Sequence, residues 1–92
     1  MRNIRLLIEY QGTNYAGWQA QKNLPTIQGT IQEKLKILTG EEIELTSASR
    51  TDAGVHALGQ VANFHTESHI QPYSIQKGLN ALLPADIVIK NA

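Results

Sequence analysis

No cysteine occurs anywhere in the 92 residues. A disulfide framework and a zinc site built on thiolates are therefore excluded. A chain without disulfides suits a reducing compartment, so we expect a cytoplasmic protein. His65 and His69 lie four apart, but their surroundings predict the end of a strand, and no carboxylate stands at ligand spacing. We expect no metal site.

Long apolar runs are also missing. No stretch approaches the roughly 20 residues that a membrane-spanning helix needs, so we expect no membrane contact. The N-terminal residues Met1 to Ile4 enter a strand pattern directly and lack the apolar core of a signal peptide.

An excess of charge of either sign is absent as well. Lys and Arg number 8, Asp and Glu number 8, and the formal net charge is zero. Proteins that bind nucleic acid by themselves are usually basic, because phosphate neutralisation supplies much of the affinity. Neutrality therefore argues against an RNA-binding function unless the charges are segregated or another segment supplies positive surface.

The residues that are present suit one small domain. The chain is 41% apolar, as expected of a folded globule rather than a disordered chain. Apolar–polar alternation or a short β-branched run predicts four strands, at Ile4–Tyr10, Ile43–Thr46, Gln60–Thr66 and from Ile87 to Ala92.

Apolar residues at helical spacing predict two helices. The first has Thr26 as its N-cap and ends at Gly40, with an apolar stripe on Ile27, Ile31, Leu35 and Leu38. Thr30 with Glu33 would fit a capping box one turn later, so the start remains open. The second helix covers Pro72–Leu82, is followed by Pro84, and carries its apolar face on Ile75, Leu79 and Leu82.

The resulting order, β-α-β-β-α-β, predicts an α+β fold of the ferredoxin-like type. In this fold a four-stranded sheet carries both helices on one face, and right-handed crossovers leave few other topologies. Such a fold supports many activities, so function has to come from particular residues.

The candidate reactive side chains lie between the second and third predicted strands, in the stretch Ser49-Arg50-Thr51-Asp52-Ala53-Gly54-Val55-His56-Ala57. One interpretation is a tight turn, in which the Asp52 side chain bonds its own backbone and Gly54 supplies positive φ. The other makes Asp52 a nucleophile or base, which the Arg50 guanidinium keeps ionised. The two are compatible. His56 is either a general acid or base or a hydrogen-bonded structural residue.

Aromatic residues are few, and three of them surround the first predicted loop, namely Tyr10, Tyr15 and Trp18. They could stack on bases, as aromatic side chains do on RNA-binding sheets. Alternatively they anchor a long loop to the domain, which is the commoner use of such residues.

Four segments, in order along the chain, resemble motifs of the TruA-type tRNA pseudouridine synthase family. Tyr10 to Gln21 resembles the family's opening motif, and Thr26 to Gly29 resembles the start of its first helix. Ser49 to Ala57, followed by Gly59-Gln60-Val61, is similar to its catalytic motif, and Asn80 to Ile87 to a later segment.

This resemblance implies isomerisation of uridine to pseudouridine in the tRNA anticodon stem-loop, without metal or organic cofactor. Asp52 matches the family's essential aspartate, and Arg50, Thr51 and His56 match RNA-binding positions. The family's enzymes have two ferredoxin-like halves with the active site in the cleft between them, and they act as homodimers. We therefore expect residues 1–92 to be the N-terminal catalytic half, lacking the C-terminal half and inactive alone.

Two other functions compete with this interpretation, a non-catalytic RNA-binding module and a protein-interaction module of the same fold. The RNA-binding module needs exposed aromatic side chains on the central strands, and the third strand offers Phe64 alone. Neutral charge favours the protein-interaction module. Neither function accounts for the residues from Ser49 to Ala57.

Overall fold

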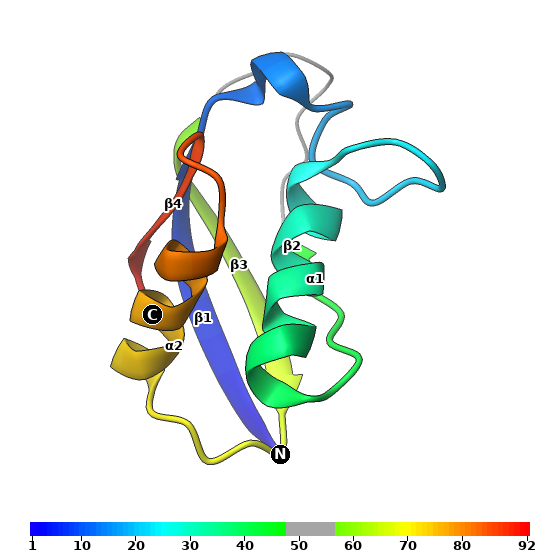
Figure 1. The fold of residues 1–92 in the computed structure, drawn as a ribbon. Coiled ribbons are helices and arrows are strands. Elements are labelled where there is room, and N and C mark those ends of the chain that lie inside the picture. Colours follow the sequence, from blue (N-terminus) through cyan, green and yellow to red (C-terminus); the bar gives the residue numbers. More distant parts are fainter. Residues whose placement is uncertain (48–56) are drawn as a thin grey trace.

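The computed structural model describes residues 1–47 and 57–92. Along this part of the chain the order of the main elements is β-α-β-β-α-β, as predicted, with a short 3-10 helix after the first strand (Figure 1). The elements are β1 (Arg2–Tyr10), η1 (Gly12–Asn14), α1 (Ile27–Thr39), β2 (Thr46–Ser47), β3 (Ala57–Thr66), α2 (Pro72–Leu82) and β4 (Ile87–Asn91).

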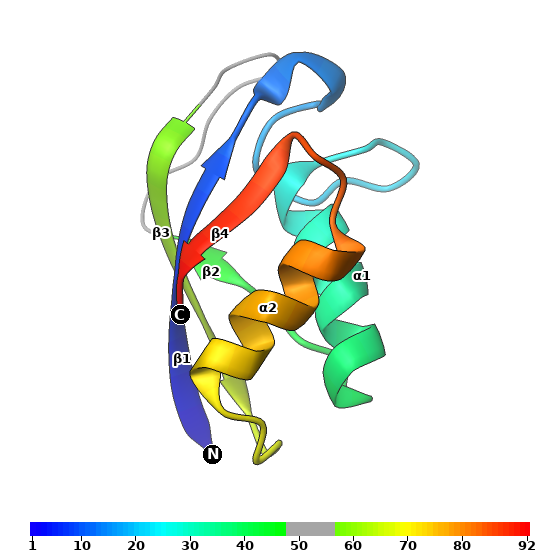
Figure 2. The same cartoon turned by 60° about the vertical axis from the view of Figure 1, so that its left-hand side comes forward.

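The strands form one antiparallel sheet in the order β2-β3-β1-β4, and Figure 2 shows α1 and α2 on the same side of it. This arrangement confirms the predicted ferredoxin-like α+β fold. Strand β1 is central, with Leu6 opposite Ala62 of β3 and Ile8 opposite Ile89 of β4. A register shift after Ile8 then places Tyr10 opposite Ala57, the first residue of β3.

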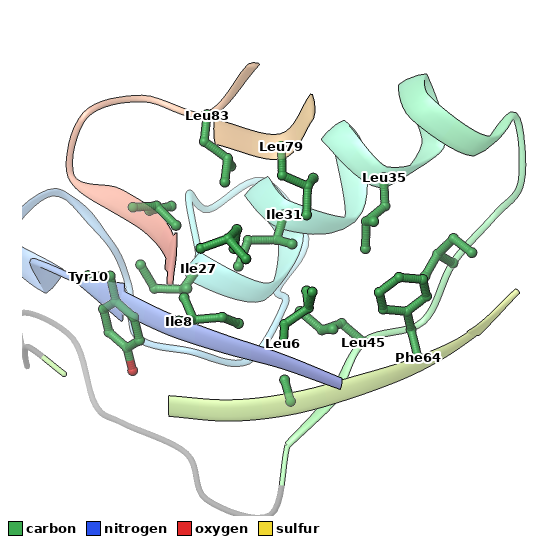
Figure 3. Close-up of a cluster of buried hydrophobic side chains, with 14 of the residues drawn as sticks. Leu6, Ile8, Tyr10, Ile27, Ile31, Leu35, Leu45, Phe64, Leu79 and Leu83 are labelled. Carbon is green, nitrogen blue, oxygen red and sulfur yellow. The ribbon is translucent and has the colours of Figure 1, made fainter. Parts of the chain in front are cut away.

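The core lies between the sheet and the two helices (Figure 3). Alternation along β1 points its even-numbered side chains into this layer, and the predicted stripe of α1 covers them. The fully buried members include Leu6, Ile8, Ile27, Ile31, Leu35, Phe64, Ile75 and Leu79. Burying each such side chain contributes about 1.5–3 kcal/mol, so this layer is the main source of stability.

Helix α1 begins where the first of the two proposed starts placed it. The Thr26 Oγ1 atom accepts a hydrogen bond from the Gly29 N–H at 3.1 Å, which satisfies one free donor of the first turn. Thr30 lies inside the helix, and its hydroxyl donates to the Thr26 carbonyl at 2.7 Å. Gly40 ends the helix with φ of 74°, a left-handed conformation that glycine adopts without strain.

Helix α2 has the predicted bounds, but one residue of its apolar face was wrong. Leu82 is 38% exposed, whereas Leu83 is buried at 8%. The helix ends at Leu82, and Leu83 turns to an extended conformation (φ −74°, ψ 150°) that returns its side chain to the core. Among the described residues, neither helix combines the length and the apolar character that a membrane span requires.

The two helices pack closely through Gly78 of α2. A Cβ atom at this position would lie 2.8 Å from Leu38 Cδ2, which is closer than van der Waals contact allows. The glycine therefore lets α2 approach the last turn of α1.

Strand β2 covers Thr46–Ser47, whereas the sequence predicted a strand at Ile43–Thr46. Strand β3 begins at Ala57 rather than at Gln60. Ile43 and Leu45 are buried, as their alternation suggested. However, side chains of α1, and not a neighbouring strand, bond the backbone of Leu45. Within the described part of the chain, the ladder between β2 and β3 pairs Thr46 with Asn63 and Ser47 with Ala62.

Candidate functional site

The four residues that the sequence assigns to the site, Asp52, Arg50, Thr51 and His56, lie outside the described residues. Their described neighbours in the chain are Ser47, the last residue of β2, and Ala57, the first residue of β3. Ser47 pairs with Ala62, five residues into β3, so β3 runs past the end of β2 toward Tyr10. The structure thus defines the two supports between which the predicted catalytic segment runs.

The first loop (residues 11–25, including η1) stands at the end of the sheet where β1 finishes. Its backbone is tied to α1, because Gly17 O accepts from Ile27 N–H at 3.2 Å and Trp18 O accepts from Gln28 N–H at 2.9 Å. It is also tied to the turn before β4, where Gln11 N–H donates to Asp86 O at 2.9 Å. These bonds hold the loop on a rigid frame.

The aromatic residues of this region anchor the loop, which confirms the second of their two interpretations. Tyr10 and Trp18 are each 2% exposed, and their ring centroids lie 6.2 Å apart. The Tyr15 hydroxyl donates a 2.7 Å hydrogen bond to Asp86 Oδ1. Burial, and then this bond to a carboxylate, raise the pKa of Tyr15 above its ordinary value. Buried rings of this kind are not free to stack on bases.

Two glutamines of α1, one turn apart, hold the chain just before β2. Gln32 Oε1 accepts from the Leu45 N–H at 2.9 Å, and Gln28 Nε2 donates to the Leu45 carbonyl at 2.8 Å. Gln28 Oε1 also accepts from the Ala20 N–H of the first loop at 2.7 Å. Gln28 therefore joins three segments, namely the first loop, α1 and the approach to β2.

A hollow of about 120 Å³ opens between the first loop and the approach to β2, lined by Trp18, Gln19, Gln28, Glu44, Leu45, Thr46 and Ser47. Its lining is mostly uncharged and polar, with Glu44 as the one ionisable side chain among these described residues. Such a surface can hydrogen-bond a ligand, but the described part of its lining includes no Lys or Arg that could receive a phosphate.

A buried amide stands on the β3 side of the same region. Gln60 is 6% exposed, and its Nε2 donates to Ser47 Oγ. The Ser47 hydroxyl in turn donates to the Val61 carbonyl at 3.2 Å. The end of β2 is thus fixed by side chains as well as by the ladder.

A larger hollow, of about 460 Å³, lies on the uncovered face of the sheet beside Arg5, Leu7 and Val61. None of the described residues that line it is acidic. In the described ranges, no three His, Asp or Glu residues are grouped so as to hold a metal ion.

Sequence reasoning missed Gln28, Gln32 and Gln60 as site-supporting residues. The signal for the first two was their spacing of four on α1, beside the apolar stripe. Glutamine is common on exposed helix surfaces, so this spacing alone does not indicate a tertiary contact.

Comparison with known proteins gives a consistent result. Residues 6–92 match the family model described as tRNA pseudouridine synthase. Curated relatives named tRNA pseudouridine synthase A are 60% identical in Acetivibrio thermocellus, 56% in Caldicellulosiruptor saccharolyticus and 53% in Geotalea daltonii. Each match covers all 92 residues of this chain but 38% of the relative. The chain therefore spans well under half the length of these proteins.

Proposed function

Because the chain belongs to the tRNA pseudouridine synthase family, we propose that it supplies the catalytic aspartate, Asp52, of an enzyme that isomerises uridine in tRNA. The observation that carries the proposal is the family match over residues 6–92, which includes the whole stretch from Ser49 to Ala57. The fold is compatible with this proposal, since β2 precedes this stretch in the chain and β3 follows it, and strands are rigid supports for reactive side chains.

The reaction is compatible with a single carboxylate. The bond between N1 of uracil and C1′ of ribose breaks, the base turns, and a bond from C5 to C1′ forms. The C5 hydrogen leaves as a proton and N1 ends protonated, so the product is an isomer and no outside reactant is consumed. Asp52 can attack the sugar, add to the base or remove a sugar proton, and each role needs an ionised carboxylate.

The target nucleoside has to leave its stack before it can react, at a cost of a few kcal/mol. Arg50 offsets this cost by filling the vacated space or by binding the adjacent phosphate, and Thr51 and His56 complete the RNA contact. We place the target in the anticodon stem-loop. Since the chain is neutral overall, most of the positive surface for tRNA comes from the rest of a longer protein, a second half and a dimer partner. The 92 residues alone are then inactive.

The competing RNA-binding module is not supported by the sheet. Of the five aromatic residues in the chain, Tyr10, Tyr15, Trp18 and Phe64 are buried. The fifth, Tyr73, lies on α2 and not on a strand. A base-stacking platform on the central strands is therefore missing.

The test uses a chimera in which residues 1–92 replace the matched segment of the Acetivibrio thermocellus relative. We expect the chimera to form pseudouridine in tRNA transcripts, and Asp52→Asn to reduce turnover by at least about 10³-fold, since the substitution removes the reacting group. Thermal unfolding of both proteins separates this loss from misfolding. Turnover near that of the parent chimera in a folded Asp52→Asn variant would refute the catalytic assignment. The proposed target is tested with transcripts that lack the anticodon stem-loop, in which the chimera should form no pseudouridine.

A further inference from the structure

The approach to β2 is held in an unusual way. Leu45 is 1% exposed, so its backbone N–H and C=O need hydrogen-bond partners inside the protein. Both partners are side-chain amides of α1, from Gln32 and Gln28. An edge residue that a strand would ordinarily pair is instead fixed to a helix, and Figure 3 shows Leu45 among the buried side chains of the core.

Gln28 differs from Gln32 in using both ends of its amide. Its Nε2 donates to the Leu45 carbonyl at 2.8 Å, and its Oε1 accepts from the Ala20 N–H at 2.7 Å. These bonds set the spacing between the first loop and the chain that enters β2. Leu45 is two residues before Ser47, beyond which lies the stretch with Asp52.

We propose that Gln28 is a positioning residue of the isomerase, which sets the separation of the first loop from the chain leading to Asp52. The proposal rests on the proposed function, in which Asp52 reacts. Gln28 does not touch the reacting atoms. It acts because catalytic groups have to sit within about 0.5 Å of their productive position, and an error of about 1 Å can reduce turnover by about 10²-fold.

The chemistry of the two glutamines provides a matched pair of isosteric variants. Gln32 contributes an acceptor to Leu45, and a carboxylate is an equally good acceptor, so Gln32→Glu keeps the contact. Gln28 contributes a donor to Leu45, so Gln28→Glu places an oxygen against a carbonyl oxygen and breaks the contact. Charge and size change equally in the two variants.

The experiment measures kcat and KM for tRNA in the chimera that carries each variant. We expect Gln28→Glu to lower kcat by about 10- to 100-fold with KM changed less than about threefold, and Gln32→Glu to stay within about threefold in both. Assays run well below the unfolding midpoint of each variant, so that the protein is folded. Equal kcat values for the two variants would overturn the proposal, as would a loss of kcat no larger than the loss of folded protein.

A second variant covers the case in which Gln28→Glu fails to fold. Gln28→Met keeps the length of the side chain, removes both bonds and adds no charge. We expect the same loss of kcat, together with faster hydrogen exchange of the Ala20 amide, while Gln32 keeps the Leu45 amide protected. Unchanged exchange at Ala20, or an unchanged kcat, would refute the role. If Gln28→Met is impaired but Asp52→Asn is not, the proposed function fails instead.

Discussion

Asn80 of α2 is predicted to hold the outer edge of the sheet, and its removal should be measurable as a loss of stability. Strand β4 is an edge strand, with β1 as its one ladder partner in the described sheet. On its other side, Asn80 Nδ2 donates to the Ile89 carbonyl at 2.9 Å, and Asn80 Oδ1 accepts from the Ile89 N–H at 2.8 Å. The Ile89 residue that these bonds serve is fully buried.

The expected magnitude follows from these contacts. Two hydrogen bonds contribute about 0.5–1.5 kcal/mol each, and Asn80→Ala removes both. The higher helix propensity of alanine offsets up to about 0.7 kcal/mol of this loss in the free energy of unfolding. Gln76 Nε2, 3.3 Å from the Ile89 carbonyl, keeps part of that acceptor satisfied. We therefore expect a net loss of about 1 kcal/mol, or about 4–8 °C in Tm for a domain of this size.

Asn80→Asp sharpens the test. The aspartate keeps an acceptor for the Ile89 N–H but places its second oxygen against the Ile89 carbonyl, so it should be less stable than Asn80→Ala. Urea unfolding followed by far-UV circular dichroism measures both, with Ser74→Ala, at an exposed position of the same helix, as the control. If both Asn80 variants unfold at the wild-type midpoint, the amide does not stabilise the edge and the reasoning is wrong.

Two further predictions concern pH. Burial and the bond to Asp86 raise the pKa of Tyr15, so its contribution to stability is complete below about pH 10 and falls as the pH rises toward the folded-state pKa. Tyr15→Phe should show a shallower alkaline decline in Tm, and an unchanged decline would contradict the assignment. The Thr66 hydroxyl, aided by the Ser68 N–H, lowers the pKa of Glu41, so its contribution holds above about pH 4.3 and falls as the pH drops through the folded-state pKa. Glu41→Gln should lose stability at neutral pH and approach wild type in acid, and a constant difference in Tm across that range would count against the contact.

Local pattern was sufficient for most of the fold. Periodicity predicted β1, α1 and α2 because their buried faces follow the geometry of the element itself, and Thr26 and Gly40 marked the ends of α1 by chemistry that acts within one turn. Two of the errors have tertiary causes. Leu83 lies after the helix and turns inward, and Leu45 bonds to glutamines that are 13 and 17 residues away in the chain.

For the candidate site, too, some features could be predicted from local sequence and others could not. Side-chain chemistry and motif order led to Asp52 and Arg50, which lie outside the described residues, so their roles stay predictions. The side-chain contacts of the described region were not predictable, because Gln28, Gln60 and Asp86 act through partners that are distant in sequence or on another element. An amide in a helix or strand does not reveal its partner until the elements are packed.

Trp18 gives the molecule an internal optical probe. It is the one tryptophan in the chain, it is 2% exposed, and its ring lies beside Tyr10 at the base of the first loop. An indole in such apolar surroundings emits at shorter wavelength than one in water. A red shift of its fluorescence would therefore signal that the first loop has detached from the sheet, without any label being attached.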